Sequence, residues 1–168
     1  SAEVEGGTKL SSLSVSTSTP PDQIDLLILA PEAFCNALQP LKPHKDYTGI
    51  STYIQSWESL DRSYQGWDVQ ERIKRGIAFY RESYGTKYVM LVGDCDAFPV
   101  RYVKAYNTEW GTKYYPSDLY YADLYRADRS FDDWDGGNPP YGGNHIFGEM
   151  DFNGFNPCDL SKLNLDRI

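Results

Sequence analysis

The sequence predicts an α/β domain in which helices flank a parallel sheet. Three short apolar runs have the length and composition of strands, and they lie at Ile24–Ala30, Ile50–Trp57 and Tyr88–Gly93. Segments with helical features separate them, and an alternation of strands and helices typically forms a parallel sheet with right-handed crossovers. The 168 residues are enough for one domain with a single hydrophobic core.

The first run, Ile24–Ala30, is almost continuously apolar, which favours a strand buried on both faces. Pro31 ends it and suits the first turn of a helix. An apolar stripe then predicts a one-sided helix that closes at Gly49, and two prolines must kink or shorten it. The stripe is Phe34, Leu38 and Leu41, and the prolines are Pro40 and Pro43.

The clearest helix follows the second strand. Asp68 is a good N-cap, and Glu71 three residues later completes a pattern that resembles a capping box. Gly85 marks the expected C-terminal stop. The face predicted to meet the sheet consists of Val69, Ile73, Ile77, Tyr80 and Tyr84.

Outside these elements the sequence is less regular. Residues 1–23 are rich in Ser, Thr and Gly and predict a flexible arm or linker, so the domain proper spans 24–168. Val100–Tyr106 is expected to extend along the sheet. Residues 107–160 are expected to be mostly long loops, acidic and rich in Tyr and Gly, and loops of that length are usually functional or disordered.

Composition narrows the classes of function. The net charge of −8, from 24 acidic and 16 basic residues, argues against a nucleic-acid partner, because phosphate binding needs clustered Lys and Arg. It fits cations, basic peptides or simple solubility. No apolar run reaches the roughly 18 residues of a membrane span. Ser1–Pro21 lacks the features of a signal peptide, although a cleaved one could have preceded Ser1.

Three blocks in fixed order resemble the gingipain-type cysteine peptidases, relatives of caspases and legumains. The first block begins with the strand at Leu26, the second spans the capped helix and the strand after it, and the third is the Tyr-rich segment. The blocks are Leu26–Glu32, Ala37–Leu41 and Thr48–Ile50; Asp68–Lys74, Lys87–Asp94 and Asp96–Tyr102; and Ser117–Leu124, Trp134–Asp135 and Ile146–Glu149. The resemblance implies a caspase-like or flavodoxin-like layered sandwich that cleaves peptide bonds with a Cys-His dyad.

In that family the dyad follows strands that lie C-terminal to the matched blocks, so the sandwich is expected to be incomplete here. The histidines are His44 and His145, and the cysteines are Cys35, Cys95 and Cys158. His145 precedes Ile instead of the family's Gly, and acidic neighbours raise a thiol pKa instead of stabilising a thiolate. The sequence therefore predicts no catalytic residue in this chain. Cys35 is expected to pack, and Cys95 to pack or remain a free thiol.

Several acidic residues are candidates for binding sites. Asp135, Asn138 and Glu149 are the expected ligands of a calcium ion in a Gly-rich loop, with a solvated acidic loop as the alternative. Four carboxylates are expected either to line a cleft or to hold loops in place. They are Asp94, Asp96, Asp118 and Asp123.

Three functions remain open from the sequence. The chain is the N-terminal part of a cysteine peptidase domain, a non-catalytic module of the same fold, or a calcium-stabilised interaction domain with aromatic contact residues. The expected partner is the missing C-terminal half of the domain or another protein chain, with neither nucleic acid nor membrane. A half-sheet also exposes a strand edge, which predicts self-association unless residues 100–125 add a covering strand. The resemblance and the calcium loop imply a secreted or cell-surface protein.

Overall fold

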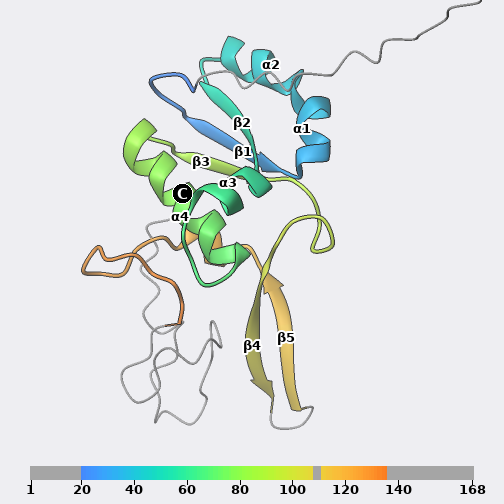
Figure 1. Ribbon diagram of the computed structural model, residues 1–168, viewed down its shortest axis with the longest axis vertical. Helices are drawn as coiled ribbons and strands as arrows, with labels where there is room; N and C mark the ends of the chain where they lie inside the picture. The colour runs from blue at the N-terminus through green and yellow to red at the C-terminus, as the bar shows by residue number, and fades with distance from the viewer. Residues whose placement is uncertain (1–19, 108–110, 136–168) are drawn as a thin grey trace, which may run out of the picture.

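The computed structural model describes residues 20–107 and 111–135. Within them, three parallel strands form a sheet in the order β2-β1-β3, with helices packed against it (Figure 1). The strands are β1 (Leu26–Ala30), β2 (Thr52–Ser56) and β3 (Tyr88–Leu91). The structure thus confirms an incomplete α/β fold with a parallel sheet and flanking helices.

β1 is the central strand, and its burial agrees with its continuous apolar sequence. Four of its five residues, Leu27, Ile28, Leu29 and Ala30, are fully buried. β3 differs from the expected buried strand, because Tyr88 is 59% exposed and the rest of the strand is half-buried. The reason is its position, since β1 is the only strand that pairs with β3 in the described residues.

The helix predicted after Pro31 is broken at Pro40 into two short helices, α1 (Glu32–Leu38) and α2 (Leu41–Tyr47), while Pro43 lies in the first turn of α2. The expected apolar stripe is wrong, because neither helix contains a buried residue and Phe34 is 44% exposed. The stripe required one continuous helix, and a break at Pro40 removes the common phase of its residues.

A further helix, α3 (Trp57–Ser63), follows β2 directly where the sequence predicted strand as far as Trp57. Ser56 ends the strand and caps the helix, since its Oγ accepts a hydrogen bond of 3.2 Å from the backbone N–H of Ser59. α3 lies against the next helix, α4 (Val69–Tyr84), where Gly76 allows close approach. A Cβ at Gly76 would lie 2.9 Å from Leu60 Cδ1.

The long helix α4 confirms the pattern in the sequence. Asp68 Oδ1 accepts from the backbone N–H of Glu71 at 2.9 Å, and Gly85 ends the helix with φ of +68°. Ile73, Ile77 and Tyr80 lie in the core. α4 therefore joins the parallel sheet to the rest of the molecule.

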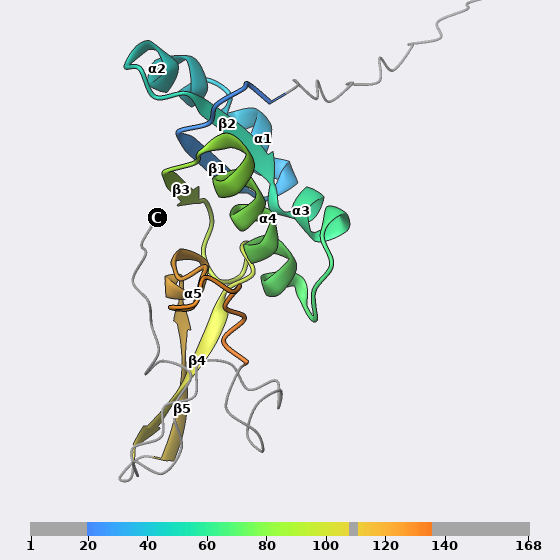
Figure 2. The same cartoon turned by 90° about the vertical axis from the view of Figure 1, so that its left-hand side faces the viewer.

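Residues after Pro99 form a second, antiparallel sheet. β4 (Arg101–Asn107) pairs with β5 (Gly111–Ser117), and the ribbon projects away from the parallel sheet (Figures 1 and 2). The expected extension of Val100–Tyr106 along the parallel sheet is wrong. Two β-prone segments so close in sequence pair with each other at a smaller entropic cost than with a distant strand.

The region expected to be mostly loop, 107–160, contains β5 and the short helix α5 (Leu119–Ala122). Aromatic residues between 111 and 135 pack in the core beside α4, and this packing explains the regular structure of that stretch. The residues it adds to the core are Tyr120, Tyr121, Leu124 and Trp134. In the described part of the chain, no helix has the length and apolar character needed to cross a membrane.

Candidate functional site

The carboxyl end of β3 opens into a tight turn built on Asp94. The backbone carbonyl of Asp94 accepts hydrogen bonds from the N–H groups of Ala97 and Phe98, at 3.0 and 2.8 Å. Its carboxylate accepts from the N–H of Asp96 at 3.1 Å. Asp94 therefore shapes the loop at the edge of the sheet where open α/β folds usually bind ligands.

A pocket of about 250 Å³ lies beside this turn, at the base of the β4–β5 hairpin. Two of the predicted carboxylates, Asp94 and Asp118, line it together with Cys95. The other lining residues are Gly93, Val100 and Pro116. The fold thus brings together one carboxylate from the parallel sheet and one from the end of β5, an arrangement that suits a cationic group.

The other two predicted carboxylates have different surroundings. Asp96 is exposed in the turn and does not line the pocket. Asp123 is buried, and its Oδ2 accepts a hydrogen bond of 2.8 Å from the indole N–H of Trp134. Asp123 thereby holds the Tyr-rich segment in place.

The two cysteines within the described residues are both free thiols. Cys35 is half-buried, and burial, followed by the charges of Glu58 and Glu32, raises the pKa of its thiol. Cys95 is exposed beside Tyr102, and it is the main cause of the raised pKa of that phenol. The surroundings of Cys35 therefore do not favour a thiolate nucleophile, which needs a positive field.

His44 lies far from Cys95 along the sheet. His44 is in α2, which leads into the amino end of β2: Asp46 Oδ1 accepts from the N–H of Thr52 at 2.8 Å. Cys95 follows the carboxyl end of β3, and both strands run parallel to β1. A strand of five residues spans about 16 Å, so these two residues sit at opposite ends of the sheet. His145 and Cys158 lie outside the described residues.

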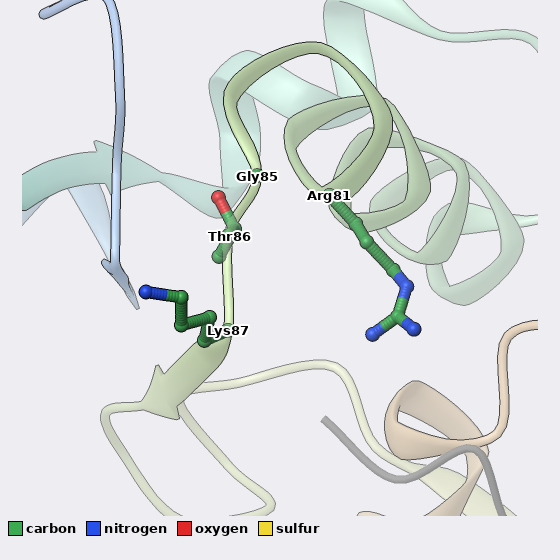
Figure 3. A pocket seen from close by; sticks show the side chains of 4 residues that line it. All are labelled: Arg81, Gly85, Thr86 and Lys87. Atoms are coloured by element: carbon green, nitrogen blue, oxygen red, sulfur yellow. The ribbon is translucent and has the colours of Figure 1, made fainter.

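A larger pocket, of about 430 Å³, lies at the opposite end of β3 beside the end of α4 (Figure 3). Its lining is Arg81, Gly85, Thr86 and Lys87. Lys87 already forms an ion pair with Asp25 at 2.8 Å, and the Thr86 hydroxyl donates to the Tyr80 carbonyl. Since Lys87 and Thr86 already bind other parts of the chain, the pocket beside Asp94 and Asp118 is the better candidate for a ligand site.

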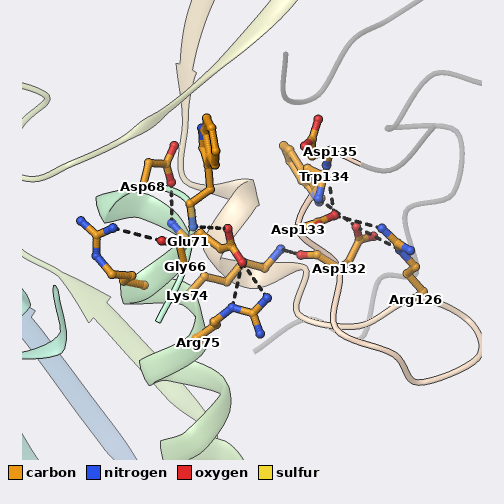
Figure 4. Close-up of polar contacts among 12 residues, drawn as sticks. Gly66, Asp68, Glu71, Lys74, Arg75, Arg126, Asp132, Asp133, Trp134 and Asp135 are labelled. Atoms are coloured by element: carbon orange, nitrogen blue, oxygen red, sulfur yellow. Dashed lines mark hydrogen bonds and ion pairs between the residues drawn. The ribbon is translucent and has the colours of Figure 1, made fainter. Parts of the chain in front are cut away.

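A buried lysine that the sequence did not predict lies between α4 and the Tyr-rich segment that follows the hairpin. Lys74 of α4 is fully buried, and its ammonium group donates to the backbone carbonyl of Asp132 (Figure 4). The ammonium nitrogen lies 4.2 Å from the centre of the Tyr120 ring, with the rings of Phe131 and Trp134 also near. Burial lowers the pKa of Lys74 to about 7. The helical face predicted from Ile73 and Ile77 does not include Lys74, so the periodic pattern gave no signal of its burial.

A second buried cation, Arg101 at the start of β4, anchors the hairpin. Its guanidinium group forms a two-pronged ion pair with Asp68, at 2.6 and 3.0 Å. It also lies 4.4 Å from the centre of the Tyr120 ring. Asp68 therefore caps α4 and holds the hairpin at once, which the sequence pattern of a capping box could not reveal.

The predicted calcium ligands fall at the margin of the described region. The backbone N–H of Asp135 donates to Asp133 Oδ1 at 3.1 Å. Asn138 and Glu149 lie outside the described residues. Within residues 20–107 and 111–135, no group of three or more His, Cys, Asp or Glu side chains gathers in a way that could hold a metal ion. The calcium site stays a prediction, which calorimetric titration with calcium checks.

The family model of peptidase family C25 matches residues 19–138. The chain belongs to this family. The resemblance to gingipain-type cysteine peptidases is thereby confirmed, and the match spans most of the described α/β domain of this C25 chain. No curated protein and no solved structure matches it.

Proposed function

We propose that this C25 chain is the N-terminal part of a cysteine peptidase domain whose Cys-His dyad comes from outside the described residues. The observation that supports this is the distance between His44 and Cys95 along the sheet, together with the acidic surroundings of both described thiols. In this role the chain supplies half of a layered sheet. The pocket beside Asp94 and Asp118 then forms one wall of the cleft.

The edge of β3 that faces away from β1 is where further strands of the sheet would pair. The described residues between 100 and 125 add no strand to this edge, because β4 and β5 pair with each other. We propose that the C-terminal half of the domain, or a second copy of the chain, pairs there. The acidic surroundings of Cys95 favour one alternative, a non-catalytic module of the same fold stabilised by calcium.

The test is a peptidase assay of the 168-residue chain beside a longer product of the same gene. The chain alone is expected to cleave no fluorogenic peptide, because no thiol in its described part has a base within reach. The longer product is expected to be active. If the chain contains its own dyad, it is active alone and loses that activity on Cys158→Ala or His145→Ala. A longer product without activity supports the non-catalytic module.

A further inference from the structure

The β4–β5 hairpin exposes tyrosine side chains and unpaired strand edges. In the described residues β4 pairs only with β5, and the ribbon stands away from the body (Figures 1 and 2). Three of its tyrosines are exposed, Tyr102 by 47%, Tyr114 by 58% and Tyr115 by 57%. A two-stranded ribbon is only marginally stable in water, and exposed strand edges attract further strands. The hairpin is therefore suited to a partner.

The two edges of the ribbon are not equivalent. Pro116 in β5 pairs with Tyr102, and it has no N–H to donate. Tyr102 and Pro116 therefore form a non-hydrogen-bonded pair of the antiparallel ladder. At such a pair, the N–H and C=O groups of both residues point away from the partner strand. By the alternation of the ladder, residues 102, 104 and 106 of β4 point their N–H and C=O groups outward. The outer edge of β4 thus has an unbroken row of N–H and C=O groups. On the outer edge of β5 this row lacks the N–H at Pro116.

Side chains at the base of β4 could contact an added strand on both faces. The register places Tyr102 and Tyr114 on one face of the ribbon, and Val103 and Tyr115 on the other. Tyr102 is half-exposed and Val103 is partly buried against the core. A strand beside β4 would gain aromatic contact on the first face and aliphatic contact on the second.

Carboxylates at the base of the hairpin indicate that the partner carries positive charge. The exposed carboxylate of Asp96 lies close to Tyr102. Asp94 and Asp118 line the pocket at the same base. The net charge of −8 opposes a second copy of this chain and attracts a cationic segment.

We propose that the outer edge of β4 binds an extended, basic segment of a partner polypeptide as an added strand. The backbone of the segment pairs with residues 102, 104 and 106. Its side chains pack on Tyr102, and a Lys or Arg lies beside Asp96 and Asp94. Strand addition of this kind takes its affinity from the backbone and its selectivity from the side chains.

The test measures binding of fluorescent peptides to the full chain by anisotropy. The probes are an unstructured peptide of alternating Lys and Val and its Glu counterpart. Lys104→Pro removes an outward N–H of β4 without removing a bond of the ladder, and Thr112→Pro makes the same change on β5. Lys104→Pro is expected to weaken binding of the basic peptide about tenfold, because a lost donor leaves the peptide's carbonyl unpaired. Thr112→Pro is expected to change the affinity less than about twofold.

Three controls complete the design. Lys104→Ala separates the loss of charge from the loss of the donor, and is expected to bind at least as well as the original chain. Circular dichroism shows that each variant folds. A basic peptide with an N-methyl group on every residue cannot donate from either edge, so it tests the same pairing with the chain unaltered and is expected to lose binding. Equal effects of Lys104→Pro and Thr112→Pro, equal binding of the acidic peptide, or undiminished binding of the methylated peptide would overturn the proposal.

Discussion

Arg101→Met is expected to lower the free energy of unfolding by about 3 kcal/mol, because it leaves the carboxylate of Asp68 without its main cationic partner. The side chain of Arg101 is 6% exposed and that of Asp68 28%, so water replaces the lost contact only in part. The aromatic ring of Tyr120 also loses the cation that lies 4.4 Å from its centre. The measurement is equilibrium unfolding in urea.

Arg62→Met is the matched control, since it removes an arginine from an ion pair in which both partners are exposed. Arg62 pairs with Glu32 at 3.7 Å, and the two side chains are 63% and 56% exposed. Exposed pairs contribute little, so the expected loss is below about 1 kcal/mol. Similar losses for the two variants would show that Arg101 does not act through a buried pair.

Asp68→Asn distinguishes the two roles of Asp68. Asparagine keeps an oxygen that can cap α4 but cannot form the ion pair. Combined with Arg101→Met, it is expected to cost much less than the sum of the two single changes, because each breaks the same contact. Additive losses would contradict the view that one carboxylate joins the helix and the hairpin.

The parts of the fold predicted from sequence are those that local rules determine. The strand at Leu26 needed only a short apolar run, and α4 needed only a cap, a periodic face and Gly85. The break at Pro40 also followed from a local rule. These elements are set by residues a few positions apart, so a single sequence contains the relevant information.

The missed parts depend on residues far apart in the chain. Arg101 pairs with Asp68 across 33 positions, and Lys74 reaches the Asp132 carbonyl across 58. No local pattern predicts such a pair. For the same reason, the sequence named four candidate carboxylates but could not assign a cleft or a structural role to each. Only the fold brings Asp94 and Asp118 to one pocket and buries Asp123.

Lys74 is expected to make the stability of the chain rise between about pH 7 and pH 10. The folded chain holds this lysine with a pKa of about 7, against an ordinary value of 10.5. Between these values the unfolded chain binds a proton that the folded chain does not, so raising the pH favours folding. Below about pH 7 both states are protonated, and the full cost of burying the charge remains. From the difference in pKa, the gain across the window is on the order of 5 kcal/mol at most.

Charged neighbours limit the size of this gain but not its sign. Asp132, Asp123 and Asp133 favour the charged lysine, while Arg101 opposes it, and burial exceeds them all. Above pH 10 the trend reverses, because burial raises the pKa of Tyr120 and Tyr80 and the unfolded chain loses those protons first.

Lys74→Met is expected to remove most of this rise, leaving less than about 1 kcal/mol between pH 7 and pH 10. Methionine has a similar length and flexibility and packs well against aromatic rings, so it replaces the stem of the lysine without its titrating group. Urea unfolding at pH 7, 8.5 and 10 measures the slope, and Lys42→Met, which removes an exposed lysine paired with Asp46, is expected to keep it. A slope that survives in Lys74→Met would show that the lysine does not cause it.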